Sequence, residues 1–200
     1  MLFNTPAQAE VTNFGTLKRI VAPEGWELED SAEPGLSARR LKLFHVPGAR
    51  EINISVFQRG APISENSANY LLVLLKSKPA MQAPQPLNLE EVLALTEVLG
   101  YSTVGDNQFT NDAKRGTRDY PVFAMELAET AMINGKTVLR VSGNFQDLQA
   151  ISTMEYKGLY FTDGQSGRIV EEVFYQAPSR VPFLKHLPQF EECLKTIEWA

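Results

Sequence analysis

The C-terminal segment, Tyr156–Trp199, constrains the fold more than any other part of the chain. Alternating apolar residues over Tyr156–Tyr175, interrupted by a polar stretch with two glycines, predict a β-hairpin. In the segment Val181–Trp199, apolar residues recur at intervals of three and four, which places them on one helix face: Phe183, Leu187, Phe190, Leu194 and Ile197. A hairpin followed by an amphipathic helix predicts a sheet with at least one helix layer packed on it.

The rest of the chain contains further strand-like and helix-like segments. Strands are expected at Thr16–Val21, Leu36–Val46, Glu51–Gln58, Pro121–Ile133 and Lys136–Phe145. Asn134-Gly135 joins the last two strands, and this dipeptide favours the positive φ angles of a type I′ hairpin turn.

Two helices are expected between these strands. Ser64 begins the first helix, and Pro79 ends it. Asn88 caps the second helix, and Glu91, three residues later, is placed to return the hydrogen bond. Gly100 stands where a C-terminal capping glycine belongs.

The order of these elements is β-β-β, α-α, β-β-β-β, α. Strands joined by hairpins form antiparallel sheets, so we predict an α+β fold in which helices cover an antiparallel sheet, an α/β/α sandwich. Residues 14–200 are expected to form a single domain, and residues 1–13 a loosely ordered N-terminal segment. A chain of 200 residues buries roughly 70% of its unfolded surface, which is enough for a core without disulfides.

Composition argues against several classes of function. The net charge is −5, and basic clusters such as Lys114-Arg115 with Arg118 are short, so nucleic-acid binding is not expected. The apolar run Leu71–Leu75 is far shorter than the ~20 residues of a membrane span. Cys193 is the only cysteine, which excludes intramolecular disulfides and cysteine-based zinc sites. We expect no cofactor and no metal.

The N-terminal sequence is compatible with two cellular locations. Met1-Leu2-Phe3 is too brief for the apolar part of a signal peptide, which favours a cytoplasmic protein. Ala7-Gln8-Ala9 has the small-x-small pattern of a cleavage site. If the true start lies upstream, the mature protein would be periplasmic or otherwise exported.

No group of residues predicts a catalytic site. His45 and His186 are expected at structural or boundary positions, and Cys193 as a small buried apolar residue. Ser166 lies in Gly164-Gln165-Ser166-Gly167, which has the wrong spacing for a serine-hydrolase elbow and reads as a hairpin turn. Three residues are candidates for partner binding: Trp26, Arg118 and Glu172. An exposed tryptophan is typical of binding hot spots, although Trp26 is more simply explained as a plug at one end of the sandwich.

The order of elements, together with Pro23-Glu24-Gly25-Trp26 after the first strand and a last helix ending in Leu194-Lys195-Thr196-Ile197, resembles the PsbP-like α/β/α sandwich superfamily. Its members include the photosystem II extrinsic protein PsbP, a Ran-binding nuclear import factor, and chaperones associated with type VI secretion effectors. The resemblance spans about residues 14–199, with the Asn88–Leu99 helix as an addition. It implies a role in binding other proteins, without a shared active site.

Three functions remain open at this point. The first is a non-enzymatic protein-binding module, such as an adaptor, a chaperone or an immunity-type protein, present as a monomer or homodimer. The second is a carrier of a small apolar ligand or lipid, with a cavity lined by Phe123, Leu139 and Phe174. The third is a hydrolase or isomerase that uses carboxylates with His45, which requires a Glu or Asp within hydrogen-bond reach of the imidazole.

Overall fold

The computed structural model describes residues 8–30, 38–59, 65–88, 90–91, 94, 122–146, 153–162 and 169–200. The strands of the larger sheet are β3 Glu27–Asp30, β4 Ala38–Val46, β5 Ala49–Arg59, β6 Gln85–Pro86, β7 Val122–Ile133, β8 Lys136–Gln146, β9 Thr153–Thr162 and β10 Val170–Ala177. Those of the smaller sheet are β1 Glu10–Phe14, β2 Leu17–Val21 and β11 Glu198–Trp199. The structure gives the bounds of two helices, α1 Glu65–Ser77 and α4 Arg180–Lys195.

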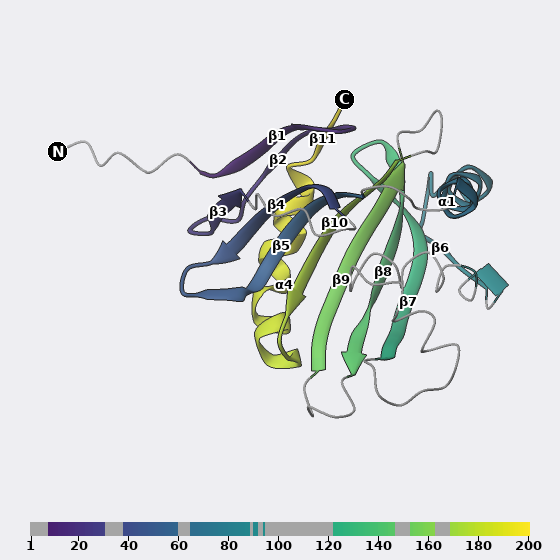
Figure 1. The fold of residues 1–200 in the computed structure, drawn as a ribbon. Helices are drawn as coiled ribbons and strands as arrows, with labels where there is room; N and C mark the ends of the chain where they lie inside the picture. Colours follow the sequence, from purple (N-terminus) through teal and green to yellow (C-terminus); the bar gives the residue numbers. More distant parts are fainter. Residues whose placement is uncertain are drawn as a thin grey trace.

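Among the described residues, the larger sheet has eight strands in the order β3-β4-β5-β10-β9-β8-β7-β6, and the smaller has three in the order β1-β2-β11 (Figure 1). Every neighbouring pair in both sheets is antiparallel. This arrangement confirms the predicted α+β fold. In the described part of the chain, no helix is long and apolar enough to span a membrane.

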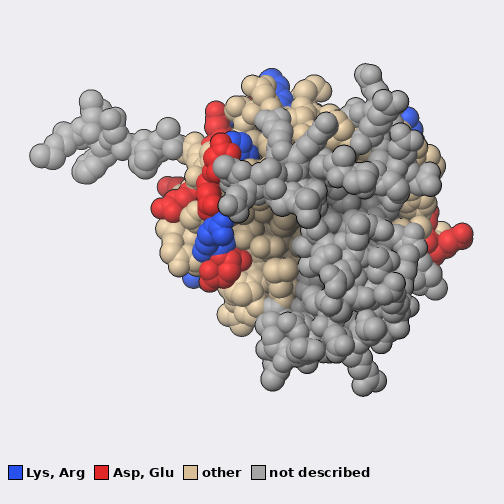
Figure 2. All heavy atoms as spheres, viewed as in Figure 1, with Lys and Arg blue, Asp and Glu red and all other residues tan. Residues whose placement is uncertain are grey.

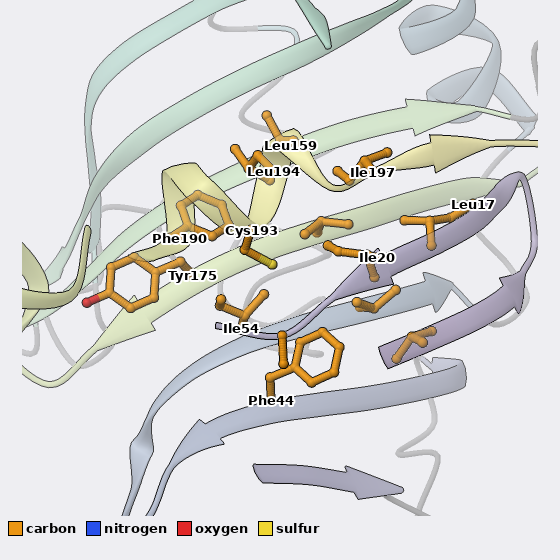
Figure 3. Packing of buried hydrophobic residues seen from close by; sticks show 14 of the residues in the cluster. Leu17, Ile20, Phe44, Ile54, Leu159, Tyr175, Phe190, Cys193, Leu194 and Ile197 are labelled. Carbon is orange, nitrogen blue, oxygen red and sulfur yellow. The ribbon is translucent and has the colours of Figure 1, made fainter. Parts of the chain in front are cut away.

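Helix α4 and the small sheet cover one face of the large sheet. The predicted helix spacing is confirmed, because Phe183, Phe190 and Leu194 are buried and Leu187 packs partly buried against the same cluster. Figure 3 shows α4 and β2 meeting the sheet through a set of fully or nearly fully buried side chains: Leu17, Ile20, Phe44, Ile54, Leu159, Tyr175, Phe190 and Leu194. Each such side chain contributes about 1.5–3 kcal/mol by leaving water.

Helix α1 covers the opposite face. Its buried leucines form a second cluster with side chains of β8, β9 and β10: Leu71, Leu74, Leu75, Leu139, Val141, Tyr156, Tyr160 and Val170. On β9, Leu159 and Phe161 belong to the α4 cluster, whereas Tyr156 and Tyr160 belong to the α1 cluster. Side chains alternate across a strand, so the two clusters lie on opposite faces and the sheet is the middle layer.

The N-terminal segment differs from the prediction. We expected residues 1–13 to be loosely ordered, but Glu10–Phe14 form β1, which pairs with β2 and buries Val11 and Phe14. The strand has only two inward-facing apolar residues, so its sequence carries little period-2 signal of its own. It is ordered by pairing with β2 and by packing on the core.

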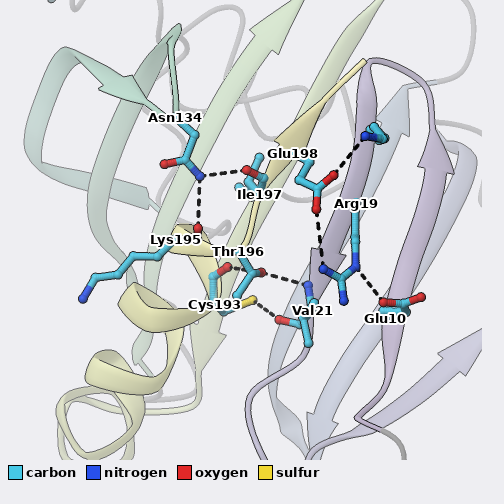
Figure 4. A network of polar contacts seen from close by, with 10 residues as sticks. Glu10, Arg19, Val21, Asn134, Cys193, Lys195, Thr196, Ile197 and Glu198 are labelled. Carbon is cyan, nitrogen blue, oxygen red and sulfur yellow. Dashed lines mark hydrogen bonds and ion pairs between the residues drawn. The ribbon is translucent and has the colours of Figure 1, made fainter.

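The Asn134-Gly135 turn is confirmed. It joins β7 to β8, and both residues have positive φ angles, 47° and 87°. The Asn134 side chain also reaches the end of α4, where its Nδ2 donates to the carbonyl oxygens of Lys195 and Ile197 at 3.2 and 2.7 Å (Figure 4). It also donates to the Leu194 carbonyl at 3.4 Å.

The cap of the second predicted helix is confirmed as well. The backbone N–H of Glu91 donates to Asn88 Oδ1 at 3.0 Å, and that of Asn88 donates to Glu91 Oε2 at 2.7 Å. This is the reciprocal capping box. Glu90, Glu91 and Ala94 are helical, and the remainder of this helix, including Gly100, lies outside the described residues.

The last helix is shorter than predicted. We expected it to reach Trp199, but it ends at Lys195, and Glu198–Trp199 form β11 beside β2. The side chain of Thr196 draws the chain toward β2, because its Oγ1 accepts the N–H of Val21 at 2.9 Å. The indole N–H of Trp199 donates to the Ile133 carbonyl at 2.8 Å, which fixes the end of the strand.

Candidate functional site

The Pro23-Glu24-Gly25-Trp26 turn places Trp26 in the core. Gly25 has a positive φ of 79°, and the Trp26 N–H donates to the Pro23 carbonyl at 3.1 Å, which closes the turn. The indole is only 6% exposed. Its ring centroid lies 6.5 Å from that of Tyr175 and 6.0 Å from that of His186. Trp26 therefore plugs the end of the sandwich and offers little surface to a partner.

Of the other two candidates for partner binding, the structure describes Glu172 but not Arg118. Glu172 is fully buried, on the same face of β10 as Phe174, which packs against the α1 cluster. A carboxylate in that position is not part of a contact surface. Arg118 lies outside the described residues, as does Ser166.

The two histidines occupy different places. His45 lies on β4 opposite Glu27 of β3, and its Nδ1 and Nε2 are each 3.9 Å from a carboxylate oxygen, of Glu27 and Glu29 respectively. These distances exceed the about 2.6–3.2 Å expected between a general base and its partner. His186 lies on α4 with its Nδ1 2.6 Å from Oε1 of Gln189.

Cys193 is a buried thiol, as the sequence predicts. It is 2% exposed, and its Sγ donates to the Val21 carbonyl at 3.0 Å. Burial raises the pKa of the thiol from 9.0 to about 12, so it is not a nucleophile at neutral pH. Among the described residues, no three His, Cys, Asp or Glu side chains lie close enough together to hold a metal ion.

A large open cavity lies along β3, at the end of the eight-stranded sheet. It has a volume of about 940 Å3, and its lining combines apolar and acidic residues: Gln8, Ala9, Pro23, Glu24, Gly25, Trp26, Glu27, Leu28, Glu29 and His45. We refer to it as the edge cavity. Leu28, which is 40% exposed, is its most accessible large apolar side chain among the described residues.

The residues of β3 that line this cavity show that it lies at the edge of the sheet. Successive side chains of a strand point to opposite faces. Glu27, Leu28 and Glu29 are consecutive, and all three line the cavity. The cavity therefore runs along the edge of β3 instead of covering one face of the sheet.

The acidic side chains of the cavity are unequally compensated. Arg50 donates two hydrogen bonds to Glu29, at 2.7 and 2.8 Å, and these hold the pKa of the Glu29 carboxyl below its usual value. Neither Glu24 nor Glu27 pairs with a described Lys or Arg. Figure 2 shows the acidic and basic side chains interleaved on the side of the molecule that carries β3, β4 and β5. The edge cavity thus keeps an excess of negative charge.

A smaller cavity of about 340 Å3 adjoins the other side of the Pro23–Glu24 turn. Its lining comes from the N-terminal segment, from the end of β2 and the turn that follows it, and from α4 with the residue after it: Gln8, Val21, Ala22, Pro23, Glu24, Pro188, Gln189, Glu192, Cys193 and Thr196. Gln8, Pro23 and Glu24 line both cavities.

The described residues that were predicted to line the cavity of a lipid carrier are packed in the core. Leu139 is fully buried against the leucines of α1, and Phe174 packs against the same cluster. Neither residue lines the two cavities described above. The side chain of Phe123 lies outside the described part of the chain.

The sequence prediction missed β3 and with it the edge cavity. No strand is predicted between Val21 and Leu36, but Glu27–Asp30 pair with β4. One signal was present, because apolar Trp26 and Leu28 alternate with acidic Glu27 and Glu29. Alternation over four residues is too short to distinguish a strand from a loop without knowledge of its partner strand.

No protein-family profile and no curated protein sequence matches this chain. Among solved structures, the chain is similar to the solution structure of cyanobacterial PsbP (CyanoP) from Synechocystis sp. PCC 6803. The TM-score is 0.56 at 12% sequence identity, and the match covers 100% of this chain and 97% of the other. At this low sequence identity, the similarity shows a shared arrangement of strands and helices and nothing more. The protein has a PsbP-like fold, as its sequence predicts.

Proposed function

We propose that the protein is a non-enzymatic accessory protein that binds another protein, and that the edge cavity receives part of that partner. The observation that carries this proposal is the cavity itself. It is open, it lies along a terminal strand, and it combines the exposed apolar side chain of Leu28 with acidic Glu24 and Glu27. A mixed apolar and polar surface of this kind is typical of protein–protein contacts.

Two further observations support the proposal. The similarity to cyanobacterial PsbP extends over 100% of this chain, and an accessory role fits that fold. The described side chains considered as catalytic candidates also lack the geometry for catalysis. The Cys193 thiol is buried, and the His45 nitrogens are 3.9 Å from the carboxylates of Glu27 and Glu29.

The test uses two exposed apolar side chains on different elements. Leu28 on β3 is 40% exposed and Val73 on α1 is 62% exposed. Each is replaced in turn by a photo-cross-linking amino acid, in the protein expressed in its own host, and the cross-linked products are identified by mass spectrometry. We expect one defined protein to be joined at position 28 and not at position 73.

A second pair of variants examines the same contact without cross-linking. Leu28→Lys should abolish copurification of that protein, whereas Val73→Lys should leave it unchanged. Cross-linking of the same protein at both positions, or at position 73 alone, would show that the edge cavity is not the docking site. If no protein is joined at position 28, the proposal fails.

A further inference from the structure

The β3 edge is the side of Glu27–Asp30 that faces away from β4. In the described part of the chain, β3 is the last strand at one end of the large sheet, and it pairs only with β4. The backbone N–H and C=O groups on its outer side can therefore accept another strand. Addition of an extended peptide to such an edge is a common mode of recognition, in which backbone hydrogen bonds give affinity and neighbouring pockets give specificity.

The charge of β3 restricts what can pair with it. Three of its four residues are acidic: Glu27, Glu29 and Asp30. Two of them are partly compensated within the sheet, Glu29 by Arg50 and Asp30 by Lys42. Glu27 is compensated by no described Lys or Arg, and Glu24 adds a second such carboxylate at the start of the edge.

This charge disfavours pairing of β3 with a second copy of itself. Two such strands side by side would oppose acidic residues to acidic residues, and like charges directly opposite one another destabilise a strand pair. Acidic edges protect sheets from association of this kind. The same charge favours a strand that carries Lys or Arg, because each basic side chain would lie beside Glu24 or Glu27.

The edge cavity adds the apolar part of the recognition. Leu28 points to the same face of the sheet as Phe44, its partner on β4, and its side chain is 40% exposed. A strand added along β3 would present alternate side chains to this apolar surface. The site therefore suits a segment in which apolar and basic residues alternate.

We propose that the segment recognised in the edge cavity is an extended, basic strand of the partner, which joins the large sheet as a ninth strand by pairing with β3. This proposal rests on the function proposed above and specifies the chemistry of the partner. The recognised unit is a stretch of about four to six residues, set by the length of β3, with Lys or Arg at alternate positions.

The test begins with a displayed library of random dodecapeptides as the probe. Peptides are selected on the whole wild-type protein and counter-selected on Leu28→Lys, after circular dichroism has shown that this variant is folded. We expect the enriched peptides to alternate apolar residues with Lys or Arg. Enrichment of acidic or uncharged peptides, or of none, would overturn the proposal.

The best peptide is then synthesised in singly N-methylated forms. An added strand directs every second N–H toward β3, so methylation at alternate positions should weaken binding more than tenfold and methylation at the positions between should not. Equal effects at all positions would mean that the peptide does not bind as a strand. Glu27→Gln should weaken binding about fivefold, equivalent to about 1 kcal/mol, while Glu90→Gln on the far side of the sheet should have no effect.

The outcomes separate this proposal from the proposed function. If position 28 cross-links to the partner but the selected peptides are not basic or do not bind as strands, the function stands and the strand addition is wrong. If position 28 joins nothing, both fail. If sedimentation shows a dimer that Leu28→Lys dissociates, the occupant of the edge is a second copy of the chain, and the basic partner is excluded.

Discussion

Asn134 caps the C-terminal end of α4 from a different part of the chain. Its Nδ2 donates to the carbonyls of Ile197, at 2.7 Å, and Lys195 (Figure 4). It donates to the Leu194 carbonyl as well. The last carbonyl groups of a helix have no partner within the helix. The residue that makes the β7–β8 turn thus also satisfies the end of the last helix, and so joins the hairpin to α4.

Asn134→Asp should destabilise the protein more than Asn134→Gly. Both new residues tolerate the positive φ of 47°. Glycine loses the hydrogen bonds, at a cost of about 1 kcal/mol, whereas aspartate turns a carboxylate toward three carbonyl oxygens and should cost about 2–3 kcal/mol. Urea denaturation measures both. Lowering the pH below the ordinary Asp pKa of about 3.9 should remove the excess for Asn134→Asp, and equal losses at neutral pH would contradict this account.

Gly15→Ala should be far more costly than Gly48→Ala, although both glycines have positive φ angles, 62° and 73°. A Cβ at position 15 would overlap Oε1 of Glu171, whereas one at position 48 would meet nothing within 4 Å. The carboxylate would have to leave the Thr16 N–H, 3.0 Å away, and the Gln58 amide, 3.1 Å away.

The expected loss of unfolding free energy is about 3 kcal/mol or more for Gly15→Ala and about 1–2 kcal/mol for Gly48→Ala. Hydrogen exchange should also show faster opening of β1 and β2 in the first variant alone. Similar losses in the two variants would mean that Glu171 does not anchor the β1–β2 turn.

The buried thiol of Cys193 should make the protein less stable at alkaline pH. Its pKa is raised to about 12 in the folded protein, against 9.0 in the unfolded chain, because burial disfavours the thiolate. The stabilising contribution is therefore complete below pH 9 and is lost as the pH rises toward 12. Between about pH 8 and about pH 10.5, wild type should lose about 2 kcal/mol relative to Cys193→Val. Parallel stability curves for the two proteins would contradict the raised pKa.

The elements that could be predicted from the sequence carry their own local signals. Asn134-Gly135 has the backbone preference of its turn, Asn88 and Glu91 exchange the two hydrogen bonds of the capping box, and the spacing of the α4 side chains defines its buried face. These features depend on residues a few positions apart, so they could be recognised without knowledge of the fold.

The elements that were missed are short strands held in place by the strands beside them. β11 is held by β2, through pairing of Glu198 with Arg19, and β1 is held by the same strand from its other side. β3 is defined by its pairing with β4 and has a single apolar residue, Leu28. Short strands at the ends of sheets bury little apolar surface, so their sequences resemble those of loops, and the candidate site lies on such a strand.

Trp26→Phe should lower stability and leave partner binding intact. The indole is 6% exposed and packs near the rings of Tyr175 and His186, so its contribution is to the core. We expect a loss of about 1–2 kcal/mol for Trp26→Phe and about 3–5 kcal/mol for Trp26→Ala in chemical denaturation. At a temperature where both variants are folded, cross-linking from position 28 should match wild type for Trp26→Phe. If Trp26→Phe is as stable as wild type but no longer binds the partner, Trp26 is a contact residue. The indole would then have to become exposed when the partner binds.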